Sequence, residues 1–139
     1  MNGAARAPAA APSLLLAFDF GTRRIGVASG NSLTGTASCL TTLAHDDSAA
    51  RFAAIGRLIA EWQPAALVVG VPRHPDGTAH DNTRRAERFV RQLRGRFGLP
   101  VHAVDERCTT TEALAAGARD VDAASAALIL EQYFNQRPS

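Results

Sequence analysis

Apolar runs separated by short polar turns predict three strands in the first third of the chain. The run Leu14–Asp19 is continuous and ends in an acid, and the runs Arg24–Ser29 and Gly35–Thr42 follow it at short intervals. Gly21 and Thr22 are typical turn residues, so the first two strands are expected to form a hairpin. Together the three runs predict a meander of consecutive strands.

After residue 45, segments whose apolar residues recur at helical intervals alternate with short apolar runs that predict strands. The segment 45–48 offers an N-cap, and apolar residues recur at helical intervals from Phe52 to Trp62, before Pro64. The remaining expected elements are, in order, a strand at Ala66–Gly70, a helix at Thr83–Phe97, a strand at Val101–Asp105, a short helix after the capping-box segment Thr109–Glu112 and a last helix from Asp120. This order, βββαβαβαα, predicts an α/β protein with a mixed sheet and helices on its faces.

The composition is that of an ordinary globular domain. Of 139 residues, 46% are hydrophobic and 20% are charged, and the net charge is only +2. We expect one domain over residues 14–136, preceded by a disordered Ala/Pro-rich extension over residues 1–13. All 15 basic residues are arginine, which excludes the lysine-containing P-loop of many nucleotide hydrolases.

The cysteines and the hydropathy pattern bear on the compartment. Cys39 and Cys108 lack the CxxC spacing of redox and metal sites, and we expect both to be reduced thiols. No apolar stretch approaches the roughly 20 residues of a membrane helix. The sequence therefore predicts a cytoplasmic protein with no membrane partner.

Acids from distant parts of the sequence are expected to meet at one edge of the sheet. Asp19 ends the first strand, Asp105 and Glu106 end the fifth, and Asp122 opens the last helix. Sites in open α/β sheets form outside the carboxyl ends of the strands, and a few carboxylates there suit Mg²⁺ and phosphoryl chemistry. Strand alternation lets only one of Asp105 and Glu106 face the site, and the sequence leaves that choice open. Asp122 alone is also explained by the helix dipole.

Five segments carry a resemblance to a known family: "FDFGTRRIGVA", "GTA" at Gly35–Ala37, "VVGVPRHPDGT", "RFGLPVHAVDERCTT" and "VDAASAALILEQYF". In this order, and over nearly all of Leu14–Phe134, the chain resembles the YqgF/RuvX family. These RNase H-like proteins are described as pre-16S rRNA nucleases or as Holliday-junction-resolvase-like proteins. The resemblance implies an RNase H-like fold with strand order 3-2-1-4-5 and a nuclease that depends on Mg²⁺ or Mn²⁺.

The family's motifs also imply the site residues. The acids of DFGT, DER and VDxAsA fall on Asp19, Glu106 and Asp122, which are then expected to be both the catalytic residues and the metal ligands. The implied role is maturation of the 5′ end of 16S rRNA, with cleavage of branched DNA such as Holliday junctions as the alternative. The chain departs from the family between DER and VDAASA. The usual longer helix and basic loop are replaced by "CTTTEALAAGARD", in which Arg119 is the single basic residue.

Arginines near these acids are the candidate nucleic-acid contacts. Arg23 and Arg24 follow the first motif, and Arg73 and Arg107 lie in expected loops beside the site. The expected helix Thr83–Phe97 adds Arg84, Arg85, Arg88, Arg91 and Arg94 opposite its apolar stripe, where a solvated surface is the competing interpretation.

Two further function classes stay open. Phosphate loops of actin-like kinases and ATPases also contain DFGT, but those proteins need two such domains. A non-catalytic RNA-binding assembly factor would keep the fold and its acids without cleaving.

Overall fold

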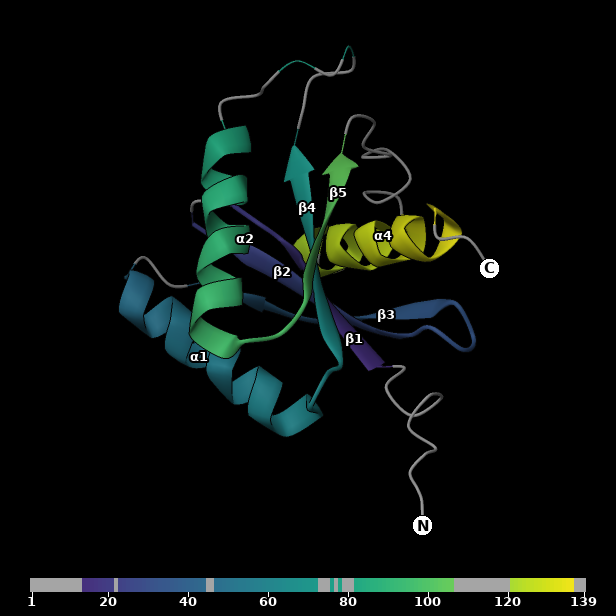
Figure 1. Ribbon diagram of the computed structural model, residues 1–139, viewed down its shortest axis with the longest axis horizontal. Helices are drawn as coiled ribbons and strands as arrows, with labels where there is room; N and C mark the ends of the chain where they lie inside the picture. Colours follow the sequence, from purple (N-terminus) through teal and green to yellow (C-terminus); the bar gives the residue numbers. More distant parts are fainter. Residues whose placement is uncertain are drawn as a thin grey trace.

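Five strands form one mixed sheet in the order β3-β2-β1-β4-β5 (Figure 1). The strands are β1 Leu14–Asp19, β2 Ile25–Asn31, β3 Thr36–Leu43, β4 Ala66–Pro72 and β5 Val101–Glu106. β1 pairs antiparallel with β2 and parallel with β4, β2 pairs antiparallel with β3, and β4 pairs parallel with β5. The predicted hairpin, mixed sheet and strand order are confirmed. β1 lies at the centre of the sheet, which explains its continuous apolar sequence.

The computed structural model describes residues 14–21, 23–44, 47–72, 76, 78, 82–106 and 121–136, without the side chains of residues 106, 121 and 136. The expected extension 1–13, the turn residue Thr22, the expected short helix after Thr109 and Cys108 lie outside these residues. Within the described part, no helix is long and apolar enough to cross a membrane.

Two helices, α1 Ser48–Trp62 and α2 Thr83–Phe97, cover one face of the sheet (Figure 1). The larger apolar cluster lies beneath them, with Phe18 and Val69 of the sheet against Phe52 of α1 and Phe89 of α2. The expected N-cap of α1 is Asp47, whose carboxylate accepts a hydrogen bond from the Ala50 amide at 2.9 Å. Local capping and apolar spacing thus account for the position of α1.

The helix α4, Val121–Gln136, covers the other face. A second apolar cluster joins Leu15 and Ala17 of β1 and Val104 of β5 to Ile129 and Leu130 of α4. Successive residues of β1 therefore alternate between the α4 face and the face of α1 and α2. The prediction of helices on both faces is confirmed.

Candidate functional site

Asp19 ends β1 between two glycines. Its pairing partners are Gly26 on β2 and Gly70 on β4. It follows Leu15 and Ala17 in the alternation, so its side chain belongs to the α4 face. Neither paired residue has a side chain, so no side chain from the paired positions on β2 and β4 lies against the half-buried carboxylate.

Gly26 also brings α4 against the same part of the sheet. A Cβ on Gly26 would lie 1.8 Å from the carbonyl oxygen of Asp122 and 2.1 Å from its carbonyl carbon. Directly paired strand residues point to the same face, so Asp19 and this vacant Cβ position face the first turn of α4. The structure therefore brings Asp19 and Asp122 to one place, although about 100 residues separate them in the chain.

Asp122 forms an ion pair with Arg24, which lies in the turn between β1 and β2. The Arg24 Nε lies 3.0 Å from the Asp122 Oδ2, with the two side chains 65% and 32% exposed. The competing interpretation of Asp122 as only a helix-dipole residue accounts for its place in the first turn but not for this pairing. Arg23 is exposed beside it. The ion pair places a positive charge beside the Asp122 carboxylate.

The register of β5 separates Asp105 from Glu106. Residue 105 pairs with Val71 and residue 106 with Pro72. Val104 belongs to the α4 cluster, whereas Val101 belongs to the cluster under α1 and α2. Asp105 therefore has the parity of the α1–α2 face, where it is exposed, and position 106 has the parity of the α4 face. The side chain of Glu106 lies outside the described residues.

Other predicted contacts are only partly within the described structure. Arg73 and Arg107 lie outside it. Among the described residues, no group of three or more His, Cys, Asp or Glu side chains is close enough to hold a metal ion. Asp19 and Asp122 are the two predicted ligands whose side chains the description includes. Asp76 accepts hydrogen bonds from the Thr78 amide at 2.9 Å and the Thr78 hydroxyl at 2.7 Å, as a turn former does.

Gly26 is the residue that sequence reasoning missed. It lies inside "RRIGVA", within a predicted strand. A glycine in a strand interior often marks a close approach of another backbone, so the signal was present. Which backbone approaches it depends on where α4 packs, and no local pattern reveals that.

Known proteins resemble this chain over most of its length. Residues 13–136 match the family model described as RuvX: Holliday junction resolvase. A protein of Polaromonas sp. (strain JS666 / ATCC BAA-500) named "Putative pre-16S rRNA nuclease" is 62% identical over 123 residues, which is 88% of each chain. A Burkholderia lata protein of the same name is 50% identical over 146 residues, covering 98% of this chain and 95% of the relative.

A solved structure shares the fold at low identity. T. thermophilus RuvC, in complex with a Holliday junction substrate, superimposes with a TM-score of 0.56 at 16% identity, covering 88% of this chain and 93% of that one. The likeness confirms the RNase H-like architecture that the sequence motifs implied.

Proposed function

This chain belongs to the RuvX family, and on that basis we propose that it is a cytoplasmic nuclease that processes the 5′ end of precursor 16S rRNA. Relatives that share half or more of their residues with it over most of the chain carry the name "Putative pre-16S rRNA nuclease". The family's own description names Holliday junctions, so branched DNA is the second candidate substrate.

The proposed catalytic residues are Asp19, Glu106 and Asp122. The observation that carries this assignment is the convergence of Asp19 and the first turn of α4 over Gly26. Strand alternation in β5 supports Glu106 over Asp105 as the third acid. Asp19 and Glu106 would then project toward the α4 face from the carboxyl ends of β1 and β5, where Asp122 lies in the first turn of α4.

The donor set fits a hard divalent cation. Carboxylate oxygens are the ligands that Mg²⁺ and Mn²⁺ prefer, and the Asp122 carboxylate already attracts a cationic group, the Arg24 guanidinium at 3.0 Å. We propose that Asp19, Glu106 and Asp122 hold one or two such ions. When bound, the cation supplies activation of a water and stabilisation of the phosphate oxygens in an in-line displacement.

The chain's own groups position the substrate in this proposal. Arg23 and Arg24 are exposed beside the acids and would contact the phosphates that flank the cut, with Arg73 and Arg107 as further contacts. In the hydrolysis, the water oxygen bonds to phosphorus as the P–O3′ bond breaks. The products carry a 5′-phosphate and a 3′-hydroxyl.

The test is cleavage of precursor 16S rRNA by the purified protein with and without Mn²⁺. Asp19→Asn is expected to abolish cleavage, because it removes a negative ligand without changing the size of the side chain. Asp105→Asn is the matched control, since the same exchange at an exposed residue of the other face should leave activity intact. Glu106→Gln is expected to behave as Asp19→Asn does.

The outcomes separate the candidate functions. Full activity of Asp19→Asn would refute the proposed site. Cleavage of a four-way DNA junction without cleavage of precursor rRNA would favour the resolvase alternative. RNA binding with no metal-dependent cleavage of either substrate would favour the non-catalytic assembly factor.

A further inference from the structure

A groove runs between α1 and α2 on the face of the sheet opposite the acids. Its inner part is a hollow of about 330 Å³ lined by Phe20, Ser48, Arg51, Phe52, Arg85, Arg88, Phe89 and Gln92. This volume falls within the range typical of ligand sites, about 300–1,000 Å³. The residues come from the position directly after β1, the start of α1 and the first ten residues of α2.

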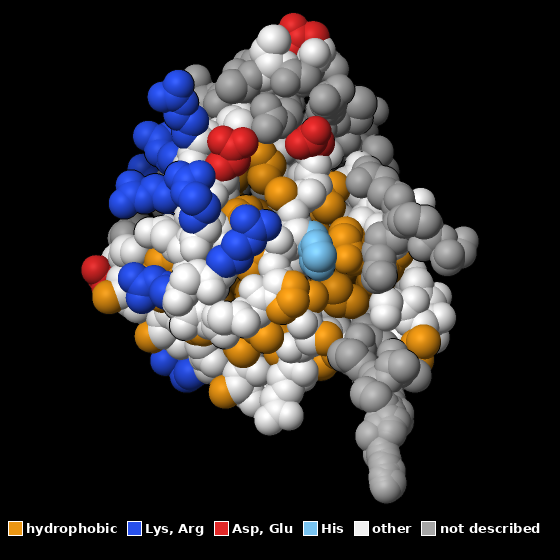
Figure 2. Space-filling view, in the orientation of Figure 1, with side chains coloured by type: hydrophobic (Ala, Val, Ile, Leu, Met, Phe, Trp, Pro, Cys, Tyr) orange, Lys and Arg blue, Asp and Glu red, His pale blue; other side chains and the backbone are white. Residues whose placement is uncertain are grey.

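The hollow concentrates positive charge. Arg51 projects from α1 and Arg85 and Arg88 from α2, and none of the described residues that line the hollow is acidic. The whole chain carries a net charge of only +2, so three arginines at one hollow are a local feature rather than a reflection of the average surface. Figure 2 shows arginine side chains gathered on the side of the molecule that carries α2. An anionic ligand complements this charge.

The floor of the hollow is aromatic. The Phe20 and Phe89 rings lie 5.0 Å apart between centroids, and the Arg51 guanidinium carbon lies 5.9 Å from the Phe20 ring centroid. Phe20 is half-buried, so part of its side chain faces the hollow. A basic groove with aromatic side chains is the combination that binds single-stranded nucleic acids, in which phosphates pair with arginine and bases stack on rings.

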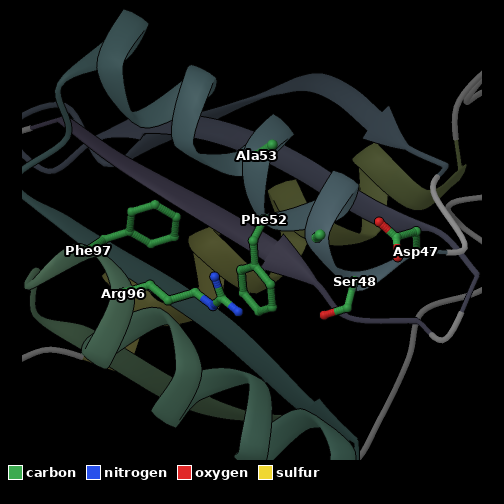
Figure 3. Close-up of a pocket in the computed structure, with 7 residues that line it drawn as sticks. Asp47, Ser48, Phe52, Ala53, Arg96 and Phe97 are labelled. Carbon is green, nitrogen blue, oxygen red and sulfur yellow. The ribbon is translucent and has the colours of Figure 1, made fainter.

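A second hollow, of about 710 Å³, adjoins the first at Ser48 and Phe52. Figure 3 shows Arg96 extending from α2 toward the Phe52 ring, and its guanidinium carbon lies 4.1 Å from the ring centroid. Asp47 also lines this hollow, where its carboxylate accepts the Ala50 amide hydrogen bond that caps α1. The groove therefore continues past the first hollow with a further arginine.

The groove opens at the same end of the sheet as the proposed acids. β1 and β4 are parallel, and α2 begins directly beyond the end of β4, where the Thr83 hydroxyl donates to the Pro72 carbonyl. Arg85 and Arg88 therefore lie in the first two turns, close to the carboxyl end of β4. Asp19 and Phe20 are consecutive at the end of β1, and they face opposite sides of the sheet.

We propose that the α1–α2 groove binds a single-stranded segment of the substrate nucleic acid, with Arg51, Arg85 and Arg88 on its phosphates and the Phe20 ring against a base. This inference rests on the proposed nuclease function, because it takes the bound strand to continue around the end of β1 to the acids. The groove would thus contribute to substrate affinity from the face of the sheet opposite the proposed catalytic acids.

The test is the salt dependence of binding to a fluorescently labelled single-stranded RNA, measured by anisotropy in EDTA so that cleavage plays no part. The logarithm of the affinity falls with the logarithm of salt concentration by about 0.7 per phosphate contact on a single strand. The double variant Arg85→Gln/Arg88→Gln is expected to reduce that slope by about 1.4. Arg84→Gln/Arg91→Gln is the matched control, because it removes the same charge from exposed positions of α2 that do not line the groove.

A third variant separates stacking from charge. Phe20→Leu is expected to weaken binding at least about fivefold with an unchanged salt slope, since it removes a ring but no charge. Circular dichroism melting of every variant checks that the fold is retained. Equal salt slopes for the two double variants would overturn the proposal. Tighter binding to an RNA duplex than to the single strand would also overturn it, if Arg85→Gln/Arg88→Gln weakens binding to both RNAs to the same extent.

The binding result is independent of the nuclease result. If Arg85→Gln/Arg88→Gln lowers the salt slope but the wild-type protein shows no Mn²⁺-dependent cleavage, the groove proposal is supported and the nuclease proposal is refuted. If the wild-type protein cleaves with Mn²⁺ and the variant binds RNA with an unchanged salt slope, the nuclease proposal is supported and the groove proposal is overturned.

Discussion

Replacing Gly26 with alanine is expected to separate the two aspartates that the fold brings together. The new Cβ would lie 1.8 Å from the Asp122 carbonyl oxygen, whereas real Cβ contacts are essentially never shorter than 3.0 Å. Because the obstructing atoms belong to the helix backbone, no side-chain rotation can relieve the clash. The start of α4 must therefore move by at least about 1.2 Å, or β2 must bend away from it.

The displacement has an energetic and a catalytic consequence. Overpacking of a well-packed interior costs typically about 1–3 kcal/mol, and a clash with rigid backbone belongs at the upper end of that range. A shift of about 1 Å at a catalytic group can cost about 100-fold in rate. Gly26→Ala is thus expected to lower the free energy of unfolding by about 2–3 kcal/mol and cleavage by about 100-fold.

Urea unfolding and Mn²⁺-dependent cleavage of precursor rRNA measure the two effects. Gly95→Ala is the control, because a Cβ on Gly95, in the last turn of α2, meets nothing within 4 Å, and the exchange should stabilise the protein by up to about 1 kcal/mol. Wild-type stability and activity in Gly26→Ala would refute the close packing of α4 on β2. Lost stability with full activity would separate that packing from the site.

Three further predictions concern single contacts. Asp47→Ala removes the side-chain cap of α1 and should cost about 1 kcal/mol in urea unfolding, and an unchanged midpoint would contradict that role. Leu130→Ala leaves a cavity at a fully buried position of α4 and should cost about 2–5 kcal/mol, whereas a loss below about 1 kcal/mol would mean that this core is loosely packed. Arg24→Gln breaks a largely exposed ion pair, so stability should fall by less than about 1 kcal/mol. The same exchange should tighten Mn²⁺ binding in calorimetry because a competing cation leaves Asp122, and weaker binding would instead assign Arg24 to holding that carboxylate in place.

Much of the architecture follows from local sequence features. The strand Leu14–Asp19 and the helix Thr83–Phe97 coincide with their predicted bounds. β2 and β3 differ from prediction by only one or two residues at their ends. The spacing of apolar residues, the turn residues and the helix caps involve only a few neighbouring residues, so a single sequence is enough to predict them. Asp19 stood out for the same reason, because a charge directly after a buried apolar run is costly unless something compensates for it.

The local sequence cannot decide whether Asp105 or Glu106 faces the proposed site. Both residues follow the same apolar run, and either is compatible with the sequence. The register of β5 against β4 assigns them opposite faces, with Asp105 on the side of α1 and α2. A shift of one residue would reverse that assignment, and the register depends on pairing partners that lie about 35 residues away.

The order of strands and helices, the candidate acids at their ends and the family of the chain are all readable from the amino-acid sequence. The packing of distant elements brings Asp19 and Asp122 together over Gly26, pairs Arg24 with Asp122, and places Arg51, Arg85, Arg88 and Phe20 around one hollow. The difference follows from the range of the interactions. Secondary structure depends on side chains a few positions apart, whereas a site depends on which helix packs on which face of the sheet and in which register, and that is set by burial of the whole core at once.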